Sequence, residues 1–149
     1  MPLDVYKRQE SDPYYTLTNP ANTDSPIVAA YYDGSSGAVA QSSGRGYTRT
    51  ERRRPDLAAP GVNVLGALPG GRFSARTGSC ASVAVTAGAV ALMLEWLVYI
   101  QEVPGVDSFQ IKSLLILGAV RPGTMEYPNR EWGYGQLNLY NTFETMRRL

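Results

Sequence analysis

The sequence of 149 residues contains no histidine and a single cysteine, Cys80. Without histidine, the chain by itself cannot complete a Ser-His-Asp or Cys-His catalytic system, in which an imidazole carries the proton. A zinc site is disfavoured for the same reason, because cysteine and histidine are the usual zinc ligands. One cysteine also excludes a framework of internal disulfides.

The chain has no excess of charge of either sign. Its 14 basic and 13 acidic residues give a net charge of +1, so we expect neither nucleic acid nor an anionic membrane as a partner. No acidic cluster has the spacing of a calcium loop, and we predict no bound metal and no cofactor. Four arginines lie between Arg49 and Arg54, a cluster that we interpret as a solvated loop.

The length fits one domain with a sizeable core. Met1–Glu10 lacks the apolar stretch of a secretory signal and shares no pattern with the rest. We therefore predict that residues 1–10 do not belong to the domain, which we place at residues 11–149. The sequence leaves the cellular location open.

The stretch from Thr77 to Trp96 organises the chain. Its Thr-Gly-Ser opening is followed by Cys80, and residues 81–94 are small or apolar except at Ser82, Thr86 and Gly88. A helix that is apolar on all sides is expected inside a protein, so we predict a buried helix with a nucleophile at its exposed start. Two alternatives are that Cys80 is a core residue and that the helix spans a membrane, although the apolar run is shorter than ~20 residues.

Strands and helices alternate along the rest of the chain. A capping box at Asp107 and Gln110 predicts a helix that runs to Arg121, and Pro55–Gly61 is typical of a turn. We expect a further helix at 137–149 and strands at 26–32, 38–40, 62–68 and 72–77. This order indicates an α/β fold.

Four segments, in this order, resemble motifs of the subtilisin-like peptidases, the subtilases. Ser-Ser-Gly-Arg-Gly at 42–46 is similar to the loop F-S-S-R-G, and residues 55–64 are similar to K-P-D-[LI]-x-A-P-G-V-x-[IV]. Residues 78–88 have the spacing of the nucleophile motif G-T-S-x-A-x-P-x-V-A-G, and 132–138 are similar to W-G-Y-G-x-[LV]-[DN]. The resemblance extends over about residues 25–148, and the four segments in this order make it specific.

The resemblance assigns roles to residues around the start of the predicted helix. With Gly78 and Gly88 on the two motif glycines, Cys80 takes the place of the nucleophilic serine and Ser79 that of the threonine. Ser79 or Ser82 could be the nucleophile only if the register slipped by one or two residues. The sequence also departs from the family here: Ala84 replaces the usual proline, and Val83 and Val85 replace residues that are usually alanine and histidine.

As a member of this family, the chain would be the C-terminal part of the catalytic domain, a subtilisin-like parallel-sheet sandwich with a buried central helix. Its function would be peptide-bond hydrolysis through an acyl-enzyme, on a protein or peptide substrate. The family's aspartate (in D-[ST]-G), histidine (in H-G-T-H) and oxyanion-hole asparagine lie upstream, so the chain would need the N-terminal part of its own domain. Gly78 and Ser79 would border the oxyanion site, and secretion is common in the family.

Two other interpretations stay open at this point. A degenerate subtilase with cysteine in place of serine would bind peptides or regulate a partner without cleaving. A plain α/β binding domain would carry the four motifs by coincidence.

Overall fold

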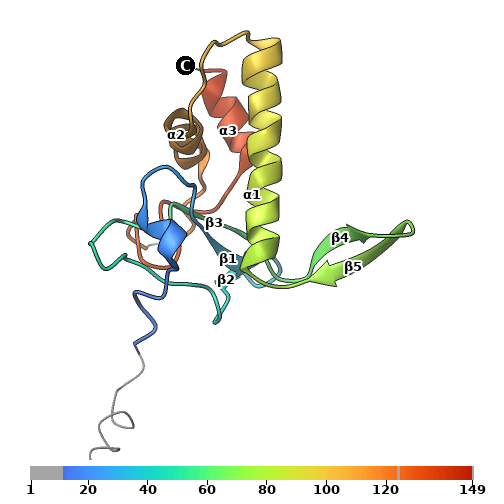
Figure 1. Cartoon of the computed structure of the whole chain (residues 1–149). Helices are drawn as coiled ribbons and strands as arrows, with labels where there is room; N and C mark the ends of the chain where they lie inside the picture. Colours follow the sequence, from blue (N-terminus) through green and yellow to red (C-terminus); the bar gives the residue numbers. More distant parts are fainter. Residues whose placement is uncertain (1–11, 124, 149) are drawn as a thin grey trace, which may run out of the picture.

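The computed structural model describes residues 12–123 and 125–148. The prediction that residues 1–10 lie outside the domain falls outside the described residues. Within them, a long helix stands beside a small sheet, two shorter helices lie along one side of it, and a two-stranded hairpin projects from its lower end (Figure 1). The mixture of strands and helices confirms the α/β class.

A three-stranded sheet forms the base of the structure. Strand β1 (Ala29–Asp33) pairs in parallel with β3 (Leu57–Pro60), with Ala29 opposite Leu57, and antiparallel with the short β2 (Ala38–Val39). The predicted turn at Pro55–Gly61 is therefore wrong for its central part, which is the buried strand β3. Leu57, Ala58 and Ala59 are fully buried, and their tertiary packing outweighs the turn preference of the flanking proline and glycine residues.

The central helix begins at the predicted position. Helix α1 (Ser79–Leu94) continues as a π-helical segment over Glu95–Ile100. It packs on β1 and β3. Burial on all sides is not observed in this chain: Ser82, Thr86, Ala89 and Met93 are buried, whereas the side chains on other faces, such as Val83 and Leu92, are about half exposed.

One side of α1 is covered because the sheet, α2 and α3 all lie on that side (Figure 1). By length and composition alone, the helix from Ser79 to Ile100 could also cross a membrane. That is weak evidence, since core helices of soluble proteins have the same properties. The expectation of no membrane partner stays a prediction.

The predicted capping box is present at the start of α2 (Ser108–Gly118). The Gln110 N–H donates to Asp107 Oδ1 at 2.8 Å, and the Asp107 N–H donates to Gln110 Oε1 at 3.0 Å. Helix α3 (Leu139–Met146) begins after Asn138, whose side chain accepts the N–H of Asn141. The main core lies where α1, its π-helical extension, β3, α2 and α3 meet, and consists of Leu57, Met93, Leu97, Ile111, Leu115 and Met146.

Helix α2 ends earlier than predicted, at a close contact with α3. A Cβ added at Gly118 would lie 2.2 Å from Thr142 Oγ1 and 2.4 Å from its Cα.

We expect Gly118→Ala to lower the free energy of unfolding by about 1–3 kcal/mol through overpacking, measured by urea denaturation. The matched control is Gly88→Ala on α1, where an added Cβ meets nothing within 4 Å; here we expect about 0.5–1 kcal/mol of stabilisation. Equal effects of the two changes would contradict the contact.

A buried charge cluster joins the N-terminal segment to β3 and α2. Arg54 forms an ion pair with Asp56, and Lys112 Nζ lies 3.9 Å from the same carboxylate. The Arg54 guanidinium also donates to the Thr23 carbonyl at 2.6 Å. The interpretation of the arginine cluster as a solvated loop is therefore wrong for Arg54, which is buried.

Burial raises the pKa of the Asp56 carboxyl, while the Val28 N–H and the two cations oppose this shift. Burial also lowers the pKa of Lys112, an effect that Asp56 opposes. Asp56 thus has a structural role, since it holds the start of β1 through Val28 and compensates two cations.

Candidate nucleophile site

The hairpin β4 (Val64–Leu68) and β5 (Arg72–Arg76) leads directly into the start of α1. Two hydrogen bonds hold this junction: the Gly78 N–H donates to the Gly61 carbonyl at 2.8 Å, and the Asn63 N–H donates to Thr77 Oγ1 at 2.9 Å. Gly78 has φ +143° and ψ 175°, a conformation essentially restricted to glycine. The chain therefore turns sharply from strand to helix, directly before Ser79 and Cys80.

The turn leaves the first residues of α1 open to solvent. Cys80 is an exposed free cysteine, and Ser79 is also exposed. The first backbone bonds of the helix run from Ala81 and Ser82 to the Gly78 carbonyl. Within the described part of the chain, the N–H groups of Ser79 and Cys80 donate to no protein acceptor. Such groups at a helix N-terminus attract negative charge.

Ser82 does not fit the role of nucleophile. Its side chain is completely buried, and its hydroxyl donates to the Ser79 carbonyl at 3.0 Å. Thr86, one turn further on, donates in the same way to the Ser82 carbonyl at 2.8 Å. Both hydroxyls satisfy backbone carbonyls inside the helix. The exposed side chains at the helix start are those of Ser79 and Cys80, and the choice of Cys80 stays a prediction.

A cavity of about 620 Å³ reaches the start of α1. It is bordered by Ser79 and Val83 of α1, by Tyr31 of β1 and by the loop at 42–45. Sequence reasoning did not single out Tyr31, whose hydroxyl contacts Ser42 and whose N–H donates to Ser43 Oγ at 3.1 Å. The similarity of residues 42–46 to a family loop was the available signal that this segment borders the site.

A second, mainly apolar cavity of about 370 Å³ lies further along α1, between Val90 and Pro26. The two cavities share Val83, Ile27 and Ala29 in their walls. Together they follow α1 from Ser79 to Val90, along its border with the start of β1.

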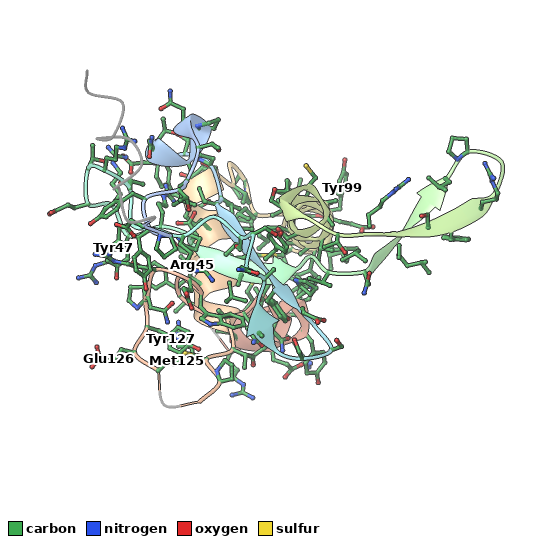
Figure 2. The ribbon with its side chains drawn as sticks, turned by 90° about the horizontal axis from the view of Figure 1, so that it is seen from below. Arg45, Tyr47, Tyr99, Met125, Glu126 and Tyr127 are labelled. Carbon is green, nitrogen blue, oxygen red and sulfur yellow. The ribbon has the colours of Figure 1, made fainter. Side chains whose placement is uncertain are left out.

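Arg45, which borders the larger cavity, is paired with Glu131 at 2.7 Å. Figure 2 shows Arg45 and Tyr47 in the body of the molecule, on the side away from the projecting hairpin. Residues 12–123 and 125–148 contain no group of three or more side chains suited to a metal ion. The described residues offer an exposed thiol and an exposed hydroxyl at a helix start, with free backbone N–H donors beside them.

Comparison with solved structures finds the same fold within longer proteins. The structure is similar to that of the CspB protease of Clostridium perfringens, with a TM-score of 0.85 and 33% identity over 91% of this chain and 30% of that chain. It is also similar to the self-cleaved protease domain of PatA, with a TM-score of 0.70 and 25% identity over 91% of this chain and 47% of that one. A prenylagaramide maturation protease, PagA, at 23% identity and a TM-score of 0.70, shares the fold over 89% of this chain and 46% of its own length.

The chain thus spans about a third to a half of the solved proteins that it matches. No curated protein matches it at a significant level. The sequence profile of the subtilase family matches residues 8–135, most of the chain. Together with the similarity to CspB, this match confirms the resemblance seen in the four motifs and rules out coincidence: the chain belongs to the subtilase family.

Proposed function

We propose that this chain is the nucleophile-bearing part of a subtilisin-like endopeptidase, in which Cys80 attacks the peptide carbonyl. The observation that carries the proposal is the exposed start of α1, where Cys80 lies at the serine position of the family motif. In a subtilase, a histidine takes the proton of the nucleophile and an aspartate orients the histidine. Since this sequence has no histidine, both groups would come from another part of the domain.

The free N–H groups at the start of α1 support an acyl-transfer site. A tetrahedral intermediate carries its negative charge on the former carbonyl oxygen, and backbone N–H donors stabilise it. The Cys80 N–H is available for this purpose, and Gly78 and Ser79 border the same position. The second donor would be the asparagine that the family supplies from upstream.

The free edge of β1 supports the proposal that a further part of the domain packs against this chain. In β1, the Val28 carbonyl points toward β3, where it accepts the Asp56 N–H. The polar groups of Ala29 therefore point to the opposite edge. On this edge β2 pairs with Tyr32 and Asp33, and the Tyr31 backbone bonds to Ala40 and Ser43. A further strand could pair with β1 at Ala29 and fill the two cavities beside α1. We propose that the N-terminal part of the same domain supplies it.

A catalytically inactive subtilase that binds peptides is the alternative, and Cys80 itself favours it. Sulfur is larger than oxygen, and a site built for a serine hydroxyl would hold the thiol out of position. A displacement of ~1 Å can cost on the order of a hundredfold in rate. The two functions differ in whether the complete protein, with cysteine at position 80, cleaves a peptide bond.

We expect the 149-residue chain alone to show no proteolysis of a casein substrate, because it lacks a general base for the thiol. Joined to the upstream part of its gene product, the same chain should cleave casein. The measurement is release of labelled peptides, with the Cys80→Ala form of each protein as the blank. Cleavage by the chain alone that disappears in Cys80→Ala would refute the proposed dependence on an upstream part.

A further inference from the structure

The start of α1 is tied to the parallel pair of strands through a buried glycine, Gly61. This residue directly follows β3, and its N–H donates to the Tyr32 carbonyl of β1 at 3.0 Å. Its carbonyl accepts the Gly78 N–H at 2.8 Å. Both backbone polar groups of Gly61 are therefore paired within the described chain, one with the sheet and one with the turn that precedes Cys80.

Gly61 also lies directly against the side chain of Tyr31. A Cβ added at Gly61 would lie 2.6 Å from Tyr31 Cβ and 2.9 Å from its Cδ2. The tyrosine is buried and fixed in β1, since its N–H donates to Ser43 Oγ and its carbonyl accepts the Ala40 N–H, both at 3.1 Å. A side chain at position 61 would therefore displace the backbone that carries the acceptor of the Gly78 N–H.

A side chain makes a second tie next to this one. The Thr77 hydroxyl accepts the Asn63 N–H at 2.9 Å, so the chain is held at two successive residues before α1. Gly78 then holds the helix itself, because its carbonyl accepts the Ala81 N–H at 3.1 Å. These bonds form a continuous path from the parallel strands to the first turn of α1, on which Cys80 lies.

We propose that Gly61 and Thr77 are positioning residues for the reaction of Cys80: they hold the turn at Gly78 and so set the direction in which the thiol and the N–H of Cys80 point. This proposal rests on the proposed function, since it assigns both roles within the same site. An oxyanion donor must lie about 3 Å from the developing charge, and a displacement of ~1 Å can cost on the order of a hundredfold in rate. A shifted turn is therefore expected to lower kcat more than it weakens substrate binding.

The first test is Gly61→Ala in the complete protein, followed by steady-state cleavage of a labelled peptide and expressed per folded molecule. We expect kcat to fall by about a hundredfold, while KM changes by less than about twofold because the lost interaction acts in the transition state. The matched control is Gly66→Ala on β4, where an added Cβ meets nothing within 4 Å; its kcat should equal that of the unaltered protein. Equal kcat in the two variants would overturn the role of Gly61.

A second pair of variants keeps the test valid if Gly61→Ala does not fold. Thr77→Val keeps the shape of the side chain but removes the hydroxyl that accepts the Asn63 N–H, whereas Thr77→Ser keeps the hydroxyl. Thr77 is exposed, so neither change overpacks the core. We expect Thr77→Val to lower kcat by up to about tenfold, the weight of one hydrogen bond, and Thr77→Ser to recover most of that loss. Equal kcat in these two variants would overturn the role of Thr77.

Amide hydrogen exchange of the complete protein, followed by NMR, measures the same ties without requiring cleavage. We expect the Gly78 N–H to exchange about tenfold faster in Gly61→Ala than in Gly66→Ala, and the Asn63 N–H about tenfold faster in Thr77→Val than in Thr77→Ser, because each variant weakens the bond that protects that amide. Unchanged exchange in both pairs would overturn the proposal. If exchange rises as expected but the unaltered protein cleaves nothing, the proposed function fails and the ties that hold the turn stand.

Discussion

Replacing Cys80 with alanine in the complete protein is expected to abolish peptide-bond cleavage. The nucleophile forms the covalent bond to the acyl group, so its loss removes the reaction path itself. We expect a fall in kcat of about 10⁴-fold: loss of the serine nucleophile in subtilisin, a member of this family, costs about 10⁶-fold, and the cysteine protein already starts up to about a hundredfold lower. The assay is single-turnover cleavage of a labelled peptide, with thermal denaturation to show that the variant is folded.

Replacing Cys80 with serine should have the opposite effect. In the proposed alignment, residue 80 stands where the family has a nucleophilic hydroxyl, and a serine side chain would remove the mismatch of the larger sulfur. We expect kcat to rise by up to about a hundredfold. Loss of cleavage in Cys80→Ser, or retained cleavage in Cys80→Ala, would contradict the role of Cys80. Ser79→Ala serves as the control, because the neighbouring exposed hydroxyl has no part in the proposed reaction.

The second large effect is expected on the free energy of unfolding, when the buried charge cluster around Asp56 is broken. Asp56→Ala would leave the guanidinium of Arg54 and the ammonium of Lys112 without their carboxylate. It would also remove the acceptor of the Val28 N–H. Removing one partner of a buried ion pair costs about 3–5 kcal/mol. We therefore expect the free energy of unfolding to fall by that amount, measured by urea denaturation at neutral pH.

The control for Asp56 is Glu144→Ala on α3. Glu144 pairs with Arg147 at 3.0 Å, and the arginine side chain is 70% exposed. Solvent-exposed pairs contribute about 0–1 kcal/mol, so this change should be nearly neutral. A similar, small effect at both positions would show that the cluster at Asp56 does not stabilise the fold.

Local signals in the sequence were sufficient to predict where helices α1 and α2 begin. Asp107 and Gln110 form the predicted capping box because the capping bonds involve residues close in sequence. The central helix starts at Ser79 because Gly78 supplies the turn and the residues after it favour helix. These features also located Cys80 at an exposed helix start.

Features that depend on distant contacts were not predictable in the same way. Pro60 and Gly61 suggested a turn, yet the preceding residues form β3 because β1 and α1 bury them. Arg54 was assigned to solvent, because part of what buries it, such as the Thr23 carbonyl that its guanidinium contacts, is far away in sequence. The apolar composition of α1 predicted burial on every side, but composition does not say which part of a protein provides the cover.

The most direct test of the account is to read the coding DNA upstream of Ser11. The account predicts that the frame continues into a subtilase segment with D-[ST]-G, then H-G-T-H, then an asparagine-bearing strand that can pair with β1 at Ala29. That result would supply the base, its orienting carboxylate and the second oxyanion donor for Cys80. A continuing frame in which the histidine or the aspartate is replaced would contradict the proposed endopeptidase and indicate an inactive, peptide-binding subtilase.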